Sequence, residues 1–138
     1  MTSSGLVTCI SKFGPKETMD RLAAAVTTRG ISIMARIDHA AAAAEIGMEL
    51  RPTEVLIFGN PRAGTPLMQA VQTVGIDLPL KALVWQDEGG TTRLAYNDPQ
   101  WPAQRHGVGA WLDRTLHAMA DALAAVAREV TTASAEEQ

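Results

Sequence analysis

Short apolar stretches recur five times along the chain, and each predicts a β-strand. In the stretch 31–38, Ile, Ile, Ala and Ile alternate with Ser, Met, Arg and Asp, which is the period of a half-buried strand. The stretch 53–59 holds four consecutive large apolar residues instead, as does a strand buried on both faces at the centre of a sheet or at a subunit contact. The predicted strands are 6–10, 31–38, 53–59, 80–87 and 91–96.

Helical spacing of apolar residues fills the intervals between these strands, and caps mark where the helices begin. Thr65 followed by Pro66 suits the N-cap and first turn of a helix that Gly75 closes. Leu and Val recur on one stripe of the last helix, from 110 to about 130. The predicted helices begin at Pro15, Asp38, Thr65, Pro99 and residue 110.

The order of these elements predicts a single α+β domain over residues 1–138, with its core at 5–130 and a frayed tail at 131–138. Glu88-Gly89-Gly90 separates two strands as a hairpin loop does, and such a short loop makes that pair antiparallel. Each helix is apolar on one stripe, which predicts a two-layer sandwich with all helices on one face of the sheet. The other face needs cover, and a homodimer would supply it.

Composition narrows the range of partners and of chemistry. Of the 138 residues, 46% are hydrophobic and 20% charged, the net charge is −3, and Lys and Arg are scattered singly. Neither a nucleic acid nor a membrane partner is therefore expected. Cys9 is the single cysteine, and the N-terminus lacks the features of a secretory signal, which together indicate a cytoplasmic protein.

The stretch 57–66, "IFGNPRAGTP", is the first candidate for chemistry. A strand, a loop with two glycines and a helix start form the arrangement in which backbone N–H groups bind an anion. The stretch lacks the Lys-Ser/Thr ending of a phosphate-binding loop, and Pro66 removes one amide at the helix start. The alternative is a capped turn in which Gly59 and Gly64 supply special backbone angles and Thr65 is the cap. Asn60, Gly64 and Thr65 are kept as candidate ligand-binding residues.

The stretch 36–39, "RIDH", is the second candidate. Arg36 and Asp38 share one face of a strand, and His39 follows directly. A carboxylate beside an imidazole fixes its tautomer and raises its basicity, so Asp38 and His39 are candidate catalytic residues. The alternative is that Asp38 only caps the Ala-rich helix that follows. No Cys pair or closely spaced His pair indicates a metal site, and nothing in the sequence assigns a cofactor.

Two further polar clusters complete the candidates. Glu49 and Arg51 precede a strand, and Arg51 is placed to pair with Asp38 or Asp98. Asn97 and Asp98 end the last strand before a proline, where a turn and a helix cap are the simpler interpretation.

Three long motifs, "RIDHAAAAAEIGMELRPTEVLIFGNPRAGTPLMQ", "GIDLPLKALVWQD" and "AYNDPQWPAQRHG", closely resemble the domain of unknown function 302 family. The resemblance extends over roughly residues 5 to 130. It implies a fold like one repeat of the TATA-box-binding protein, with a curved antiparallel sheet, a homodimer, and a bacterial or archaeal source without an assigned substrate. The matching residues are Asp38, His39, Glu49, Leu50, Arg51, Pro52, Gly59, Asn60, Pro61, Gly64, Thr65, Pro66, Pro79, Lys81, Tyr96, Asn97 and Asp98.

Three functional hypotheses follow. In the first, a homodimer binds a small polar or anionic ligand, which Arg36, Asp38, His39 and Arg51 hold beside the loop 60–65. In the second, a small hydrolase or lyase uses His39 as its base, with Asp38 or Asp98 as the orienting carboxylate. In the third, the domain acts on partner proteins through its dimer surface, and the loop only turns the chain.

Overall fold

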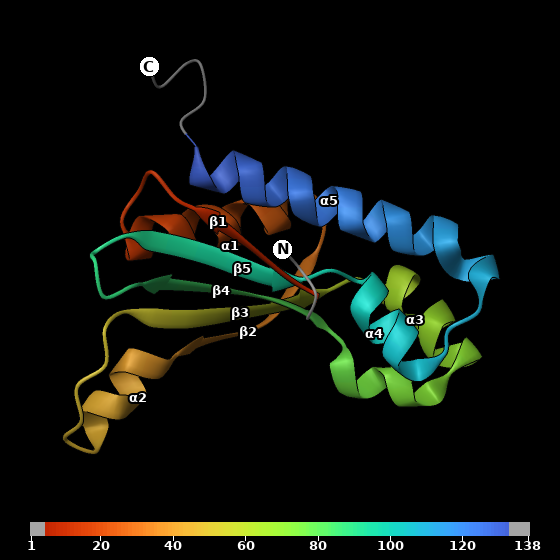
Figure 1. Ribbon diagram of the computed structural model, residues 1–138, viewed down its shortest axis with the longest axis horizontal. Helices are drawn as coiled ribbons and strands as arrows, with labels where there is room; N and C mark the ends of the chain where they lie inside the picture. The colour runs from red at the N-terminus through yellow and green to blue at the C-terminus, as the bar shows by residue number, and fades with distance from the viewer. Residues whose placement is uncertain (1–4, 133–138) are drawn as a thin grey trace.

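A computed structural model describes residues 5–132. Within this range the chain forms one five-stranded sheet in the order β1-β5-β4-β3-β2, with every neighbouring pair antiparallel (Figure 1). The strands are β1 (Leu6–Ile10), β2 (Ser32–Asp38), β3 (Thr53–Gly59), β4 (Leu80–Gln86) and β5 (Thr92–Asn97). The predicted antiparallel sheet and its hairpin between β4 and β5 are confirmed.

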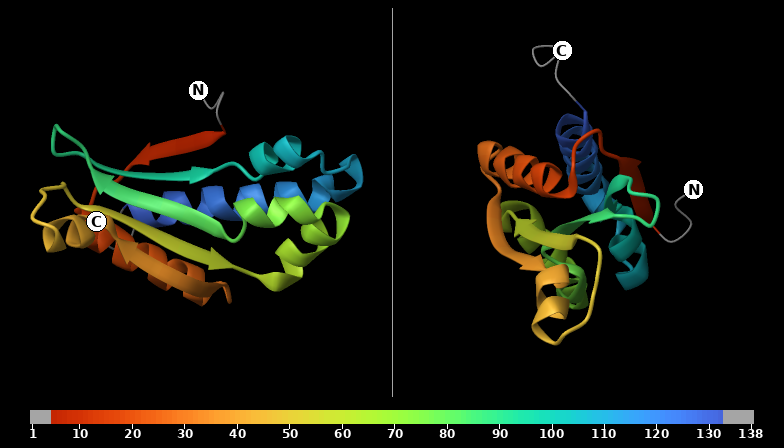
Figure 2. Two further views of the ribbon diagram at one scale, coloured as in Figure 1. Left: turned by 90° about the horizontal axis from the view of Figure 1, so that it is seen from below. Right: turned by 90° about the vertical axis from the view of Figure 1, so that its left-hand side faces the viewer.

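Helices cover one face of this sheet. The two longest lie side by side, α1 over β2, β3 and β4, and α5 over β1 and β5 (Figure 2). The helices are α1 (Pro15–Thr28), α2 (His39–Glu45), α3 (Pro61–Ala70), α4 (Gln100–His106) and α5 (Asp113–Thr131), with 3₁₀ turns η1 (Gln72–Asp77) and η2 (Ala110–Leu112). The predicted two-layer α+β sandwich is confirmed.

Two apolar clusters form the core. The larger joins the sheet to α1 and α5, and Phe58, Leu56 and Met19 at its centre are fully buried. The smaller joins α3 and η1 to α4 and the start of α5. Leu80 packs against both clusters. The two clusters therefore meet along a seam between α3 and α5.

The opposite face of the sheet is open. Val7 and Cys9 of β1 pack against the core, so the alternation of a strand places Leu6, Thr8 and Ile10 on the open side. There Ile10 is 59% exposed and Leu6 46%. This face carries the apolar surface for which the sequence pattern predicts a cover.

Three details differ from the sequence prediction. The third helix begins at Pro61, with Asn60 as its N-cap, so Thr65 is not the cap and Pro66 lies inside the helix. Gly59 and Gly64 do not adopt positive φ, so their special backbone angles were wrongly predicted. A register shift between Ile33 and Ala35 breaks the alternation of β2, an edge strand that is mostly exposed.

The C-terminal tail differs as well. Thr131, predicted to fray, is the last residue of α5 and is buried, and its hydroxyl donates to the carbonyl oxygen of Ala127 at 2.7 Å. Thr132 follows the helix, and its hydroxyl donates to the carbonyl oxygen of Arg128 at 2.7 Å. Residues 133–138 of the predicted tail lie outside the described residues.

Candidate functional site

A cleft of about 760 Å³ lies on the helical side of the molecule, along the seam between the two core clusters. Its walls come from the C-terminal end of α1, the start of β2, the end of β3, α3, the connection from η1 to β4, and α5 from Arg114 to Val126. In Figure 1 this is the region where α5 passes above α3. Ligand sites in proteins have volumes of about 300–1,000 Å³, so the cleft is large enough for a small molecule.

The floor and walls of the cleft are predominantly apolar. Phe58 and Val26 belong to the buried core and form part of the lining. Met34 of β2 also lines the cleft and is 52% exposed. Met68 of α3 also contributes. Methionine side chains are flexible and polarisable, and they adapt to apolar ligands of different shapes.

Small side chains on α5 leave the space open. Thr115, Ala118 and Ala122 recur at intervals of three and four, so they lie on one side of the helix, and all three line the cleft. Gly64 and Gly75 line it from the other side. At Gly75 an added Cβ would lie 3.2 Å from the sulfur of Met68, so the glycine allows a close approach to that side chain.

The charge of the cleft is of one sign. Among its lining residues in the described chain the charged ones are Arg62, in the first turn of α3, and Arg114, in the first turn of α5. Both side chains are exposed, and neither guanidinium has a hydrogen bond or ion pair within residues 5–132. The chain as a whole has a net charge of −3, so this local positive charge does not follow from composition.

The amides at the start of α3 are already used within the chain. The amide of Arg62 donates to Oδ1 of Asn60 at 3.0 Å, and the amides of Ala63 and Gly64 donate to the carbonyl oxygen of Asn60. The backbone cradle for an anion that the strand–loop–helix order suggests is therefore not available here. An anion in this cleft would meet arginine side chains instead.

Three of the sequence-predicted residues, Asn60, Gly64 and Thr65, line this cleft. The residues of "RIDH" and Arg51 do not, because they lie at the opposite end of the sheet. Asp38 pairs with Glu54 near the start of β3, whereas Gly59 at the end of β3 pairs with Ser32. Glu54 and Gly59 are five positions apart on an extended strand, which separates the two ends by about 17 Å. The single recess predicted from these two groups is not formed.

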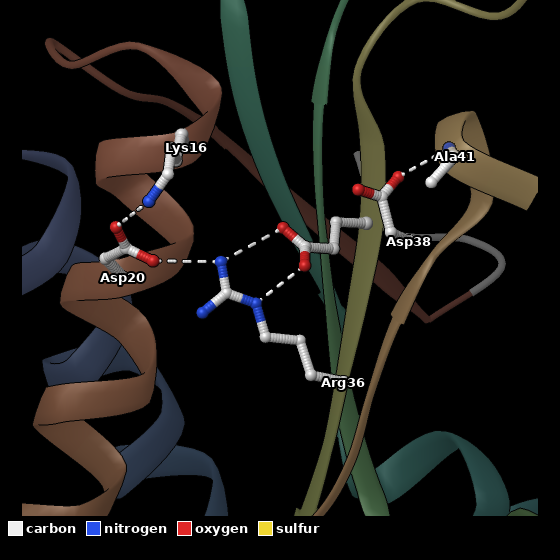
Figure 3. Close-up of polar contacts among 6 residues, drawn as sticks. Lys16, Asp20, Arg36, Asp38 and Ala41 are labelled. Carbon is white, nitrogen blue, oxygen red and sulfur yellow. Dashed lines mark hydrogen bonds and ion pairs between the residues drawn. The ribbon is translucent and has the colours of Figure 1, made fainter. Parts of the chain in front are cut away.

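Arg36 belongs to an ion-pair network between β2, β3 and α1 (Figure 3). Its Nε donates to Glu54 at 2.6 Å and its Nη2 to Asp20 at 2.9 Å, and Lys16 donates to the same Asp20 carboxylate at 2.8 Å. The hydrogen bond to Glu54 raises the pKa of Arg36, and the hydrogen bonds from Lys16 and Arg36 lower the pKa of Asp20. These contacts attach the edge strand to α1.

The predicted catalytic pair occupies the start of α2. Oδ1 of Asp38 accepts a hydrogen bond from the amide of Ala41 at 2.8 Å, so Asp38 caps this helix as one interpretation of the sequence held (Figure 3). His39 is exposed, and no hydrogen bond joins its ring to another described residue. Asp98 lies near the other end of the sheet, following β5, so it is not placed to orient His39.

The remaining predicted residues are dispersed. Arg51 pairs with neither Asp38 nor Asp98, since its Nε donates to the carbonyl oxygen of Gln86 at 3.3 Å. Glu49 is exposed in the connection between α2 and β3. Asn97 is exposed at the end of β5. Oδ1 of Asp98 accepts from the amide of Gln100 at 3.0 Å in the turn before α4, whose N-cap is Pro99.

One polar cluster was not predicted from the sequence. Nε2 of His106 lies 2.6 Å from Oδ2 of Asp77, its Nδ1 lies 2.9 Å from the hydroxyl of Thr73, and Arg105 donates to both carboxylate oxygens of Asp77 at 3.0 Å. Partial burial would raise the pKa of Asp77, but the hydrogen bond from His106 and the charge of Arg105 lower it. The cluster fastens α4 to η1. No group of three or more His, Cys, Asp or Glu suited to a metal ion occurs in residues 5–132.

Comparison with known proteins identifies the family. Residues 7–126 match the family described as domain of unknown function DUF302. The chain belongs to the DUF302 family. A crystal structure of an uncharacterized conserved DUF302 protein from Bacillus stearothermophilus has the same fold, with a TM-score of 0.82, 21% sequence identity, and coverage of 94% of this chain and 100% of that one.

Curated relatives of this DUF302 chain are longer proteins. It is 48% identical over 116 residues to the fluoride-specific ion channel FluC 1 of Brucella suis and to the FluC 1 of Brucella abortus. The match covers 84% of this chain but 46% and 43% of those proteins, so the chain spans less than half the length of the curated relatives it matches. Among residues 5–132, no helix combines the length and the apolar character that a bilayer crossing requires.

The cleft was missed by sequence reasoning, but part of its signal is present in the DUF302 chain. The small residues at 115, 118 and 122 form a stripe beside the large apolar stripe of α5, and such a stripe indicates close packing or space. Arg62 lies within the stretch 57–66, whose glycines and caps are its more conspicuous features. No local pattern places Arg114 near it, because more than fifty positions separate them.

Proposed function

We propose that this DUF302 domain binds a small, largely apolar ligand in the cleft between α3 and α5. The observation that carries the proposal is a cleft of about 760 Å³ with apolar walls, whose charged lining residues among those described are both arginines. Apolar walls open to water are unfavourable by about 25 cal/mol per Å² of exposed area, and a ligand that covers them recovers this free energy. The proposal retains a small ligand, but this ligand is more apolar than the polar or anionic one that the sequence suggested.

A neutral apolar dye tests the cleft itself. Nile red should bind the wild-type protein with an increase in its fluorescence, and Ala118→Trp, which fills the cleft, should weaken binding at least tenfold. Ala24→Trp is the matched control, since Ala24 is also an exposed helical alanine but does not line the cleft. Equal dye binding by both variants would place the dye elsewhere and remove the support for this site.

We also propose that a second copy of the chain covers the open face of the sheet, so that the domain is a homodimer. The support is the exposed apolar surface of Leu6, Ile10 and Ile37 on the side away from the helices. Sedimentation velocity at micromolar concentration should give a dimer, and Ile10→Glu should shift it to a monomer, whereas Ala24→Glu on the outer side of α1 should not. A monomeric wild-type protein would contradict this part of the proposal and would also leave the third hypothesis without its surface.

The curated relatives favour a further candidate function, a domain that works beside a FluC-type channel. The support is 48% identity to part of proteins named fluoride-specific ion channels. Removing the matching segment from the Brucella suis protein should alter fluoride flux into vesicles without abolishing it. Two results together would argue against this candidate: the shortened protein has the same fluoride flux as the complete one, and compounds that bind the isolated domain do not change the flux of the complete protein. His39 does not line this cleft, and the catalytic hypothesis with His39 as base stays a prediction.

A further inference from the structure

We infer that the ligand of the α3–α5 cleft is a single-chain amphiphile with an anionic head, such as a medium-chain carboxylate, whose head contacts Arg62 and Arg114. This inference rests on the proposed binding function and specifies the ligand class. Its basis is the combination of an apolar interior and a charge of one sign in one cleft. Neither arginine is assigned a role by the family description.

The charge of the cleft is complementary to an anionic head. Three other guanidiniums of the chain are paired with carboxylates, Arg36 with Glu54, Arg93 with Asp87 and Arg105 with Asp77. Within the described chain Arg62 and Arg114 have no such carboxylate, and no acidic residue stands among the described residues that line the cleft. An anionic ligand would supply the missing partner, because a guanidinium and a carboxylate form the stronger, charge-assisted kind of hydrogen bond.

The positions of the two arginines also suit such a ligand. Arg62 and Arg114 belong to the first turns of two helices that both line the cleft. The apolar lining extends along α5 from Met119 to Val126, about one to three turns beyond Arg114, and down to Phe58 on the sheet. A head at the arginines therefore leaves an apolar path for a tail. A compact anion such as inorganic phosphate would leave that path uncovered, and a long-chain cation would meet repulsion.

The arrangement of basic residues suits a free amphiphile and not a membrane surface. A surface-binding domain presents several basic residues on one exposed face, whereas Lys and Arg are scattered over this chain and its net charge is negative. The cleft is hollowed into the seam between two core clusters, which suits a molecule that enters it. We therefore expect binding to the free carboxylate and not to anionic vesicles.

The experiment measures displacement of Nile red from the full chain by three ten-carbon probes: decanoate, 1-decanol and decyltrimethylammonium. Decanoate should bind roughly tenfold more tightly than 1-decanol, the ammonium should bind most weakly, and added salt should weaken decanoate alone. Arg62→Gln and Arg114→Gln should each weaken decanoate roughly fivefold, the upper range for an exposed ion pair, and leave 1-decanol unchanged. Circular dichroism verifies that each variant is folded.

Arg128→Gln is the matched control. It removes the same charge from the same helix, but Arg128 lies on the order of 20 Å further along α5 and does not line the cleft. Loss of decanoate binding in this variant as well would show a net-charge effect and overturn the inference.

The outcomes separate the two proposals. Equal affinity for decanoate and 1-decanol would overturn the anionic head while the apolar cleft stands. Failure of all three probes, together with failure of Nile red, would overturn the proposed function itself. Sedimentation with anionic vesicles, in the absence of decanoate binding, would assign the arginines to a membrane surface and also overturn the inference.

Discussion

The start of α3 provides a quantitative test of the fold, because sequence and structure assign its cap to different residues. Oδ1 of Asn60 accepts a hydrogen bond from the amide of Arg62 at 3.0 Å, and this satisfies one of the amides that a helix start leaves without a partner. Thr65, the predicted cap, lies inside the helix, and its hydroxyl has no hydrogen bond to another described residue. Asn60→Ala and Thr65→Ala therefore have opposite expected effects.

The magnitudes follow from these local contacts. Replacing an Asn cap by Ala costs about 1 kcal/mol. Asn60→Ala should lower the free energy of unfolding by that amount and reduce Tm by about 4 °C for a chain of this length. Thr65→Ala replaces a β-branched residue by the best helix former, so it should be neutral or stabilising by about 0.5 kcal/mol. Asn60→Asp keeps an acceptor at the cap and should retain most of the wild-type stability.

Urea unfolding followed by circular dichroism measures all three variants against the wild type. The slope of the free energy with urea should stay constant, which shows that the variants expose the same surface on unfolding. A Thr65→Ala variant that loses about 1 kcal/mol while Asn60→Ala loses none would refute the assignment. It would mean that α3 begins at Pro66 in solution, so residues 61–65 would not form the helical wall of the cleft.

Three further predictions concern the acid response, the thiol and the core. Partial burial would raise the pKa of Asp77, but the hydrogen bond from His106 lowers it. This carboxylate therefore stabilises the fold above about pH 3.9 and loses its contribution as the pH falls through the lowered pKa. The difference in unfolding free energy between wild type and Asp77→Asn, measured in urea, should shrink from pH 6 to pH 3, and a constant difference would contradict this prediction. Burial raises the pKa of Cys9, so iodoacetamide at pH 8 should label the native thiol more slowly than the thiol in urea, and equal rates would contradict the burial. Leu56→Ala removes a fully buried side chain and should cost about 3 kcal/mol of unfolding free energy, whereas Ile10→Ala on the open face should cost under about 1 kcal/mol in the monomer; similar costs would contradict the placement of the core.

Secondary structure was predictable here because local patterns determine it. The strand 53–59 and the helix start at Pro15 agree with the observed bounds, since an apolar run and a proline at the first position are unambiguous locally. The helix start at Thr65 was wrong because two cap-and-proline pairs, Asn60-Pro61 and Thr65-Pro66, compete in the same stretch. Either pair satisfies the local rule, and packing of Leu67 into the second apolar cluster accompanies the longer helix.

The candidate site was less predictable because strand direction decides which ends meet. Neighbouring strands of an antiparallel sheet run in opposite directions. The end of β2 therefore lies beside the start of β3 and away from the end of β3. Asp38 and Asn60 are therefore separated, although both follow a strand. The sequence pattern predicted antiparallel pairing between β4 and β5, and the same pairing of β2 with β3 explains why the polar residues do not converge.

Hydrogen bonds to the backbone account for three of the polar candidate residues. Asp38, Asn60 and Asp98 each accept a hydrogen bond from a backbone amide two or three positions later. Asn and Asp at the junction of a strand and a helix fulfil this local role first, because unsatisfied helix amides are costly. A carboxylate in such a position is committed to the backbone. Its presence in a motif therefore gives little information about a ligand.

The arginines of the cleft present the reverse case. Arg62 and Arg114 support no cap and no ion pair among the described residues, and their removal should leave stability almost unchanged. Their lining of an apolar cleft is thus not explained by the requirements of folding. Side chains that the fold does not use, on walls that the fold leaves open, are more informative about function than polar residues that complete a helix. The seam between α3 and α5 is therefore the part of the molecule that points to a function.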